Sequence, residues 1–183
     1  MISEKKLYTS DEFWEFSNLP ENQNRFFERV RGEIVEVSPS NLYSSAVSML
    51  IGRALLNFIN GKNLGYVTGE QGGYDLPEET TYAPDVAYIS KERQAELPYR
   101  GFTRAAPELA VEVVSPGNTA SEINRKVLDF LGAGTQLVWV VYPDTRTVNV
   151  HTSAGSRTLR EDDTLDGGDV LPGFRLRVRD IFP

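Results

Sequence analysis

The sequence contains no cysteine and a single histidine, His151. The absence of cysteine excludes disulfide bonds, thiolate metal sites and cysteine nucleophiles. One histidine cannot build a histidine-rich zinc site, and a Ser-His-Asp triad would have to use His151, which we expect to be structural in a hairpin strand. The chemistry open to this chain therefore rests on carboxylates, lysine, arginine, tyrosine and a bound metal ion.

A basic stretch and a long apolar run are also missing. The 183 residues carry a formal net charge of −7, whereas a protein that binds DNA by neutralising phosphates usually has a basic face. No run approaches the roughly 18 apolar residues of a membrane span, and the N-terminus lacks the apolar core of a signal peptide. We expect one cytoplasmic domain, 1–183, without a membrane partner. Its acidity disfavours a tight passive DNA binder but leaves room for an enzyme with a local basic groove.

Hydrophobic spacing and turn residues predict a mixed α/β (α+β) domain with few helices and many strands. The predicted helices cover 10–18, 44–59 and 119–131, the first with Ser10 as N-cap. Arg31-Gly32 predicts a β-hairpin near the N-terminus. Strands are predicted at 25–30, 33–37, 64–68, 73–76, 85–90, 109–115, 137–142 and 147–152, with a last strand and turn in the C-terminal tail.

One predicted strand carries a carboxylate inside an apolar run, at Glu112 in the stretch AVEVVSPG. Alternation along the strand places Glu112 on the face that also carries Ala110 and Val114. A buried carboxylate without a partner is costly. Either Glu112 faces solvent, or a nearby group makes its charge favourable.

Two further residues offer such a group. Asp85 follows Pro84 at the start of another predicted strand, and two carboxylates on neighbouring strands repel each other unless a cation lies between them. Mg²⁺ is the simplest such cation, because it needs only one or two protein carboxylates. The helical period places Lys126 at the edge of the apolar face of 119–131 and Arg125 in solvent. Asp85, Glu112, Lys126 and a metal ion form a coherent set for phosphodiester hydrolysis.

Each of these residues also has a simpler interpretation. Asp85 alone can cap a strand, and Lys126 can extend to solvent or pair with Glu122. Glu70 can complete the acidic cluster, although a turn residue is the simpler role. Glu28 and Glu33 flank the first hairpin turn and are expected to be surface charges. The aromatic side chains of the first helix, Phe13, Trp14 and Phe16, suit either core packing or a partner interface, and Trp139 is expected in the core.

Several stretches resemble the Uma2 family of predicted nucleases, once catalogued as a domain of unknown function. The resemblance is carried by APDVAYIS, by PELAVEVVSPGNTASEINRKVLDFLGAGTQLVWVVYPDTRTVNVH, by FFERVRGEIVEVSPS and by VLPGFRLRVRDIF, and it covers nearly the whole chain. It implies the PD-(D/E)XK restriction-endonuclease-like fold, with a mixed central sheet flanked by helices and an N-terminal β-hairpin extension.

The resemblance also implies roles. Asp85 and Glu112 match the acidic residues that bind Mg²⁺ or Mn²⁺, and the carbonyl of Val113 matches a further metal ligand. The family pattern would place a lysine at position 114, where this chain has Val114, and Lys126 is the natural replacement. DNA is the implied substrate, and a homodimer is implied because many enzymes of this fold cut as dimers.

Alternative functions remain open on the sequence. Many relatives carry a histidine just after the Ser-Pro of the first hairpin, whereas this chain has Asn41-Leu42-Tyr43-Ser44 there. A non-catalytic nucleic-acid or protein interaction module on the same fold agrees with the overall acidity. Two-carboxylate glycoside hydrolysis leaves Lys126 without a role.

Overall fold

The structure is a computed structural model and describes residues 6–183. Its centre is a six-stranded sheet in the order β10-β9-β8-β7-β6-β3. Strands β7 and β8 are parallel, whereas the other neighbouring pairs of this sheet are antiparallel, so the sheet is mixed as predicted. Its strands are β3 (Gly65–Gly69), β6 (Val86–Ser90), β7 (Leu109–Val113), β8 (Leu137–Tyr142), β9 (Thr147–Thr152) and β10 (Gly155–Leu159).

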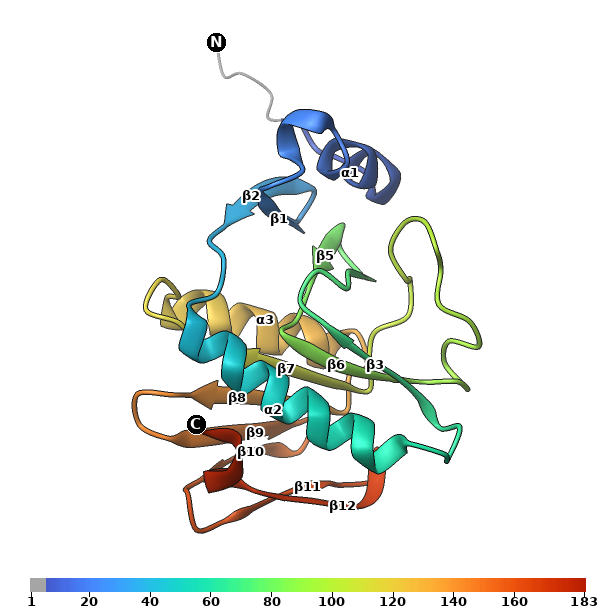
Figure 1. The fold of residues 1–183 in the computed structure, drawn as a ribbon. Helices are drawn as coiled ribbons and strands as arrows, with labels where there is room; N and C mark the ends of the chain where they lie inside the picture. Colours follow the sequence, from blue (N-terminus) through green and yellow to red (C-terminus); the bar gives the residue numbers. More distant parts are fainter. Residues whose placement is uncertain (1–5) are drawn as a thin grey trace.

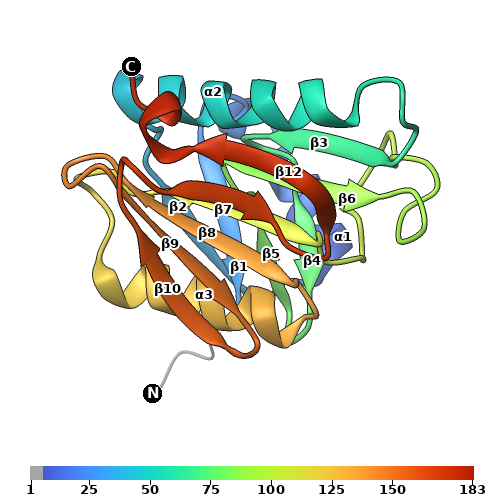
Figure 2. The same cartoon turned by 90° about the horizontal axis from the view of Figure 1, so that it is seen from below.

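Helices cover both faces of this sheet. Helix α2 (Leu42–Ile59) lies on one face and α3 (Ala120–Gly132) on the other, as Figures 1 and 2 show. A two-stranded ribbon, β11 (Thr164–Gly167) with β12 (Leu171–Arg177), and the short 3₁₀ helix η2 (Val178–Ile181) lie on the α2 side. The predicted arrangement of a mixed sheet between helices is confirmed.

The N-terminal hairpin belongs to a second, four-stranded antiparallel sheet in the order β2-β1-β5-β4. Arg31 and Gly32 both have positive φ, 53° and 79°, as a tight two-residue hairpin turn requires. The chain leaves this sheet at Tyr82 and enters the six-stranded sheet at Val86. The three residues between them end in Asp85, which therefore lies where the two sheets meet. The strands are β1 (Phe26–Val30), β2 (Glu33–Val37), β4 (Tyr74–Leu76) and β5 (Thr80–Tyr82).

The three helices were all predicted, with small differences at their starts. Helix α1 (Ser10–Ser17) is capped by Thr9, one residue before the predicted cap, because Thr9 and Glu12 form a capping box. Helix α2 begins two residues early, after Asn41, whose side chain accepts a hydrogen bond from the Ser44 N–H. Helix α3 follows Thr119, which forms a second capping box with Glu122.

The sequence did not predict four elements separately: η1 (Pro20–Asn22), β5, β10 and β11. Strand β5 has only three residues, and four of the five residues of β10 are exposed, so neither shows an alternating apolar pattern. Cross-strand pairing with β1, β4 and β9 defines them instead.

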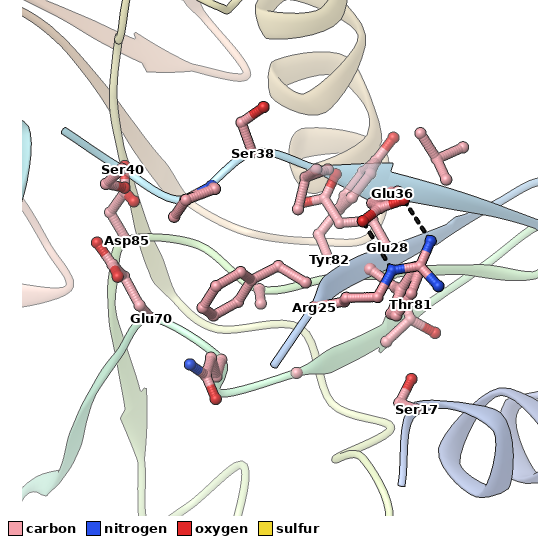
Figure 3. Close-up of a pocket in the computed structure, with 18 of the residues that line it drawn as sticks. Ser17, Arg25, Glu28, Glu36, Ser38, Ser40, Glu70, Thr81, Tyr82 and Asp85 are labelled. Carbon is pink, nitrogen blue, oxygen red and sulfur yellow. Dashed lines mark hydrogen bonds and ion pairs between the residues drawn. The ribbon is translucent and has the colours of Figure 1, made fainter. Parts of the chain in front are cut away.

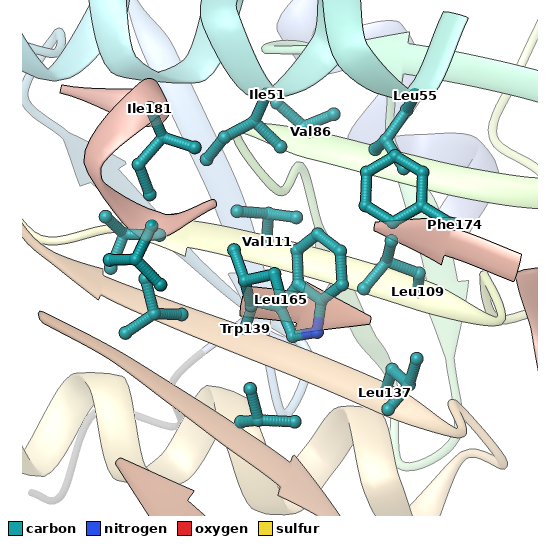
Figure 4. Close-up of a cluster of buried hydrophobic side chains, with 14 of the residues drawn as sticks. Ile51, Leu55, Val86, Leu109, Val111, Leu137, Trp139, Leu165, Phe174 and Ile181 are labelled. Atoms are coloured by element: carbon teal, nitrogen blue, oxygen red, sulfur yellow. The ribbon is translucent and has the colours of Figure 1, made fainter. Parts of the chain in front are cut away.

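The apolar core lies in two layers, one on each face of the central sheet. The α2 layer contains Trp139, which is fully buried and stacks on Phe174 of β12 (Figure 4), so the prediction that Trp139 is a core residue is confirmed. The α3 layer packs Ile123, Val127 and Phe130 against the sheet. These apolar layers hold β7 from both sides and fix the positions of its side chains.

Helix α2 corrects one expectation from the sequence. Among the described residues, it is a helix long and apolar enough by length and composition to cross a membrane, with 18 residues and a mean hydropathy of 1.4. Its Ser, Arg and Asn residues interrupt the apolar run, so the sequence contains no unbroken apolar stretch of that length. Because Val47, Ile51 and Leu55 pack in the core, α2 is also the kind of core helix that meets the same criterion.

Candidate active site

A buried ion cluster joins three elements near the carboxyl end of β7, an interior strand of the central sheet. The Nζ atom of Lys126, on α3, lies 2.7 Å from Oε1 of Glu28 on β1 and 3.1 Å from Oε2 of Glu112 on β7. Glu28 and Glu112 are each only 6% exposed. The ammonium also lies 5.3 Å from the centre of the Tyr82 ring. The structure therefore directs Lys126 toward Glu112, as the helical period predicted.

Asp85 lies beside this cluster and is fixed by the backbone of β7. Its Oδ2 accepts a hydrogen bond from the Val113 N–H at 2.6 Å. Strands β6 and β7 pair Val86 with Val111, so continuing that register would set Pro84 opposite Val113. Proline has no N–H. The Val113 carbonyl, which points the same way as its N–H in a strand, consequently loses its ladder donor and is directed toward the side of Asp85.

The positive charge of Lys126 does not balance the charges of all the carboxylates at this site. Burial raises the pKa of Glu112 to about 8, with Asp85 and Glu28 opposing its ionisation and Lys126 favouring it. Burial likewise raises the pKa of Asp85 to about 6, and the charges of Glu70 and Glu28 act in the same direction. One ammonium is shared among several carboxylates, so the cluster has room for a further cation.

For Lys126, the charges of neighbouring residues outweigh the effect of burial on the pKa. Burial alone would lower its pKa, but Glu112 and Glu28 outweigh burial and hold the pKa well above its ordinary value. Lys126 therefore stays protonated at neutral pH. It can donate hydrogen bonds and stabilise negative charge, but it cannot accept a proton as a base.

The lack of a compensating positive charge is seen at the second carboxylate oxygen of Glu112. Oε1 of Glu112 is buried and has no hydrogen-bond partner among the described residues. A buried unpaired carboxylate oxygen is unfavourable. Within 6–183, no group of three or more His, Cys, Asp and Glu side chains is arranged to hold a metal ion. A cation here would need the backbone carbonyl and water in addition to the two carboxylates, which suits Mg²⁺.

These groups open onto a pocket of about 570 Å³ between the two sheets. Asp85, Glu112, Lys126 and Glu28 line it, as does Glu70, which follows β3 directly. Figure 3 shows Glu70 close to Asp85, across the pocket from the paired Arg25 and Glu36. Glu70 therefore does face the acidic site, whereas Glu33 does not line this pocket.

Two expectations about charged side chains were wrong. Glu28 is not a surface charge, because its strand turns it toward α3, where it pairs with Lys126. Arg125 is not fully in solvent, since its Nε is buried and its side chain lines the pocket. Glu122 caps α3 through Thr119, and the acidic partners within hydrogen-bond reach of Lys126 are Glu28 and Glu112.

The residue that the sequence analysis missed is Glu28, and a signal for it exists. Alternation in β1 puts Glu28 on the same face as Phe26 and Val30, a carboxylate between apolar residues like Glu112 in β7. A second ion pair holds this hairpin on α3, since Arg31 lies 2.7 Å from Asp129. Local alternation marks Glu28, but only the docking of the hairpin shows what it faces.

The other candidate residues have structural roles, although Phe13 and Ser115 also line the pocket. His151 is half-buried on β9, and burial lowers its pKa. The Ser115 hydroxyl donates to Asn118 in the turn after β7, in agreement with a strand end. Phe13 is buried and stacks on Phe102, so it serves packing.

A mixed sheet between helices, with carboxylates and a lysine at the ends of two interior strands, is the architecture of a restriction-endonuclease-like α+β protein. The Uma2 family model, described as "Putative restriction endonuclease", matches residues 13–179, and the chain belongs to this family. The crystal structure of a "putative nuclease belonging to DUF820" from Anabaena variabilis superposes with a TM-score of 0.81 at 20% identity, covering 95% of this chain and 97% of that chain. A search of curated proteins found no match. Family membership supports a nuclease role, and the likeness to the solved structure shows the shared fold.

Proposed function

We propose that the protein is a metal-dependent nuclease that hydrolyses DNA phosphodiester bonds where β6 begins and β7 ends. The observation that carries this proposal is the under-neutralised pair Asp85 and Glu112 beside a protonated Lys126. A soluble domain rarely keeps buried carboxylates without compensation unless they serve a site. Membership of a family described as "Putative restriction endonuclease" supports the same reaction.

The residues present suit Mg²⁺ or Mn²⁺. Asp85, the unpartnered Oε1 of Glu112 and the carbonyl of Val113 would hold the ion, with water in the remaining positions. A divalent ion there would polarise the phosphate and lower the pKa of a bound water. Hard oxygen ligands without histidine or cysteine favour these ions over zinc.

Lys126 acts in this proposal through its positive charge. Because its ammonium stays protonated, it orients the attacking water and stabilises negative charge that develops on the phosphate. Glu28 is a positioning residue, since it holds the ammonium from the side opposite Glu112 and touches neither water nor phosphate in this scheme.

A cleavage assay tests the proposal. Plasmid and oligonucleotide DNA are incubated with the protein and Mg²⁺ or Mn²⁺, beside Asp85→Asn and Glu112→Gln, which keep side-chain size. We expect cleavage by the wild type and none by either variant. Asp169→Asn, at an exposed turn outside the pocket, is the matched control and should cleave normally. Equal cleavage by all four proteins would overturn the assignment.

Calorimetric titration with Mn²⁺ separates this function from a non-catalytic interaction module on the same fold. The acidity of the chain is the observation that favours such a module. If the metal site is functional, the wild type binds Mn²⁺ and Asp85→Asn and Glu112→Gln do not. If the protein is a non-catalytic module, neither the wild type nor either variant binds Mn²⁺.

A homodimer remains part of the proposal. The outer face of α2 carries Leu42, Met49 and Leu56 at seven-residue spacing, with exposed fractions of 89%, 71% and 51%. Such a stripe is self-complementary in an antiparallel helix pair centred on Met49, as a two-fold interface requires. Sedimentation of the wild type and of Met49→Glu tests it: the wild type should sediment as a dimer and the variant as a monomer.

A further inference from the structure

The pocket beside the ion cluster has a second wall of different chemistry. Phe26 and Val37 are partners across the hairpin, as are Glu28 and Val35, so all four side chains share one face of the β1–β2 hairpin. All four line the pocket, together with Trp14 of α1. The wall that faces the carboxylates is therefore largely apolar and aromatic.

The far end of this wall is fixed by aromatic packing. Trp14 meets the edge of the Phe102 ring at 5.3 Å between ring centres, and Phe13 stacks on the same ring. Phe102 lies directly over Gly73, where a β-carbon would come within 2.2 Å of the ring. A glycine at position 73 is thus needed for the ring to lie there, and Trp14 remains half-buried at the pocket.

The charges of the pocket do not favour phosphate. Three cations line it: Arg25, Arg125 and Lys126. Arg25 is paired with Glu36, and Lys126 with two carboxylates. Against them stand six carboxylates, of Glu28, Glu36, Glu70, Asp85, Glu112 and Glu122. Attraction of a nucleic acid by phosphate neutralisation is therefore weak here, and affinity must come from another part of the nucleotide.

We propose that the apolar wall formed by Trp14, Phe26, Val35 and Val37 is a nucleobase subsite and that the substrate enters as an unpaired DNA strand. This inference rests on the proposed function, because it sets the base beside a phosphodiester held at Asp85 and Glu112. A base stacks on an aromatic ring with little regard to sequence. A base within a duplex is hidden in the stack and must leave it to enter a pocket.

Fluorescence anisotropy tests the subsite without requiring cleavage. A labelled single strand of about 12 nucleotides and the matched blunt duplex are titrated with protein in the presence of Ca²⁺. Ca²⁺ has the same charge as Mg²⁺ and also binds oxygen ligands. We expect the single strand to bind at least about tenfold more tightly than the duplex. Its affinity should depend only weakly on salt, with a slope well short of the roughly −0.7 per phosphate contact of a phosphate binder.

Substitutions in the wall sharpen the result. Phe26→Ala should weaken single-strand binding roughly 5- to 150-fold, the range for loss of one stacked base, whereas Phe26→Tyr keeps the ring and the affinity. Trp14→Ala is the second variant, and thermal unfolding checks that each remains folded. Duplex binding as tight as single-strand binding, or unchanged affinity in both alanine variants, overturns the subsite.

The two proposals fail in different ways. Tight single-strand binding that depends on Phe26, without cleavage in Mg²⁺ or Mn²⁺, supports the subsite and rejects the nuclease. Cleavage that needs Asp85 and Glu112 but is equal on duplex and single strand, and indifferent to Phe26→Ala, supports the nuclease and rejects the subsite.

Discussion

The two faces of strand β7 differ in chemistry, since one packs into the apolar core and the other carries a buried charge. On one face Leu109, Val111 and Val113 pack into an apolar layer with α2 and β12. On the other face Ala110 is followed by Glu112, which meets Lys126 and lies near Asp85. Five consecutive residues thus contribute both to a dry core and to a charged site.

The difference shows how the free-energy cost of burying charge on the Glu112 face is offset. The apolar face holds the strand through burial, at about 25 cal/mol for each Å² removed from water. The charged face instead needs paired partners, and Lys126 and the hairpin residue Glu28 provide them. Removing a partner from the charged face should therefore change function and pH dependence, whereas changes on the apolar face should alter stability alone.

The largest effect is expected for Lys126→Met. The change leaves Glu28 and Glu112 buried without their cation, so the free energy of unfolding near neutral pH should fall by about 3–5 kcal/mol. DNA cleavage should fall roughly 100- to 1,000-fold, as for the loss of one donor to a developing charge. Urea unfolding and cleavage rates measure the two effects. Leu109→Met is the control on the apolar face, with an expected cost below about 1.5 kcal/mol and normal cleavage.

Glu28→Gln should have the next largest effect. Lys126 would lose one of its two anionic partners while its contact with Glu112 remains, so kcat should fall roughly 10- to 100-fold with little change in KM. The acidic limb of the pH–rate profile should move to lower pH, because the charge of Glu28 adds to burial in raising the pKa of Asp85 and of Glu112. Glu33→Gln makes the same charge change on the same hairpin outside the pocket. An unaltered profile in Glu28→Gln would remove Glu28 from the site.

The metal-free protein should lose stability as pH rises. In the folded state burial raises the pKa of Glu112 from 4.5 to about 8 and that of Asp85 from 3.8 to about 6, so the folded state retains protons that the unfolded chain releases. The free energy of unfolding must then decrease with pH across these two windows.

Urea unfolding in EDTA at about pH 5 and about pH 8 measures this slope. Glu112→Gln should flatten it, since the neutral amide does not titrate. Saturating Mn²⁺ should counteract it, because metal binding requires the deprotonated carboxylates. A wild-type stability that increases over this range, with no change in Glu112→Gln, would contradict the assigned pKa shifts.

The smallest effect is expected for His151→Gln. His151 lies on β9 and does not line the pocket, so the free energy of unfolding should change by no more than about 0.5 kcal/mol. Cleavage should keep its rate and its pH profile. A marked loss of activity near pH 6.5, the ordinary pKa of histidine, would instead indicate that His151 takes part in catalysis.

Local sequence determined much of this molecule. The spacing of apolar residues, two threonine capping boxes and the Arg31-Gly32 turn specify three helices and the main strands, because each depends on neighbours within a few residues. Alternation alone placed Glu112 on the face opposite Val111, and the helical period placed Lys126 toward the sheet. The carboxylate inside an apolar run marked Glu112, the proline before a strand marked Asp85, and the family resemblance implied metal-binding roles for both.

Tertiary structure alone decided what surrounds those residues. Glu28 lies 84 positions before Glu112 in the chain and meets Lys126 only because the hairpin docks on α3. The missing donor for the Val113 carbonyl arises only when the register of β6 and β7 sets Pro84 opposite it. Periodicity reports which face of an element a side chain occupies, whereas the burial and charge that shift a pKa depend on which other elements pack there.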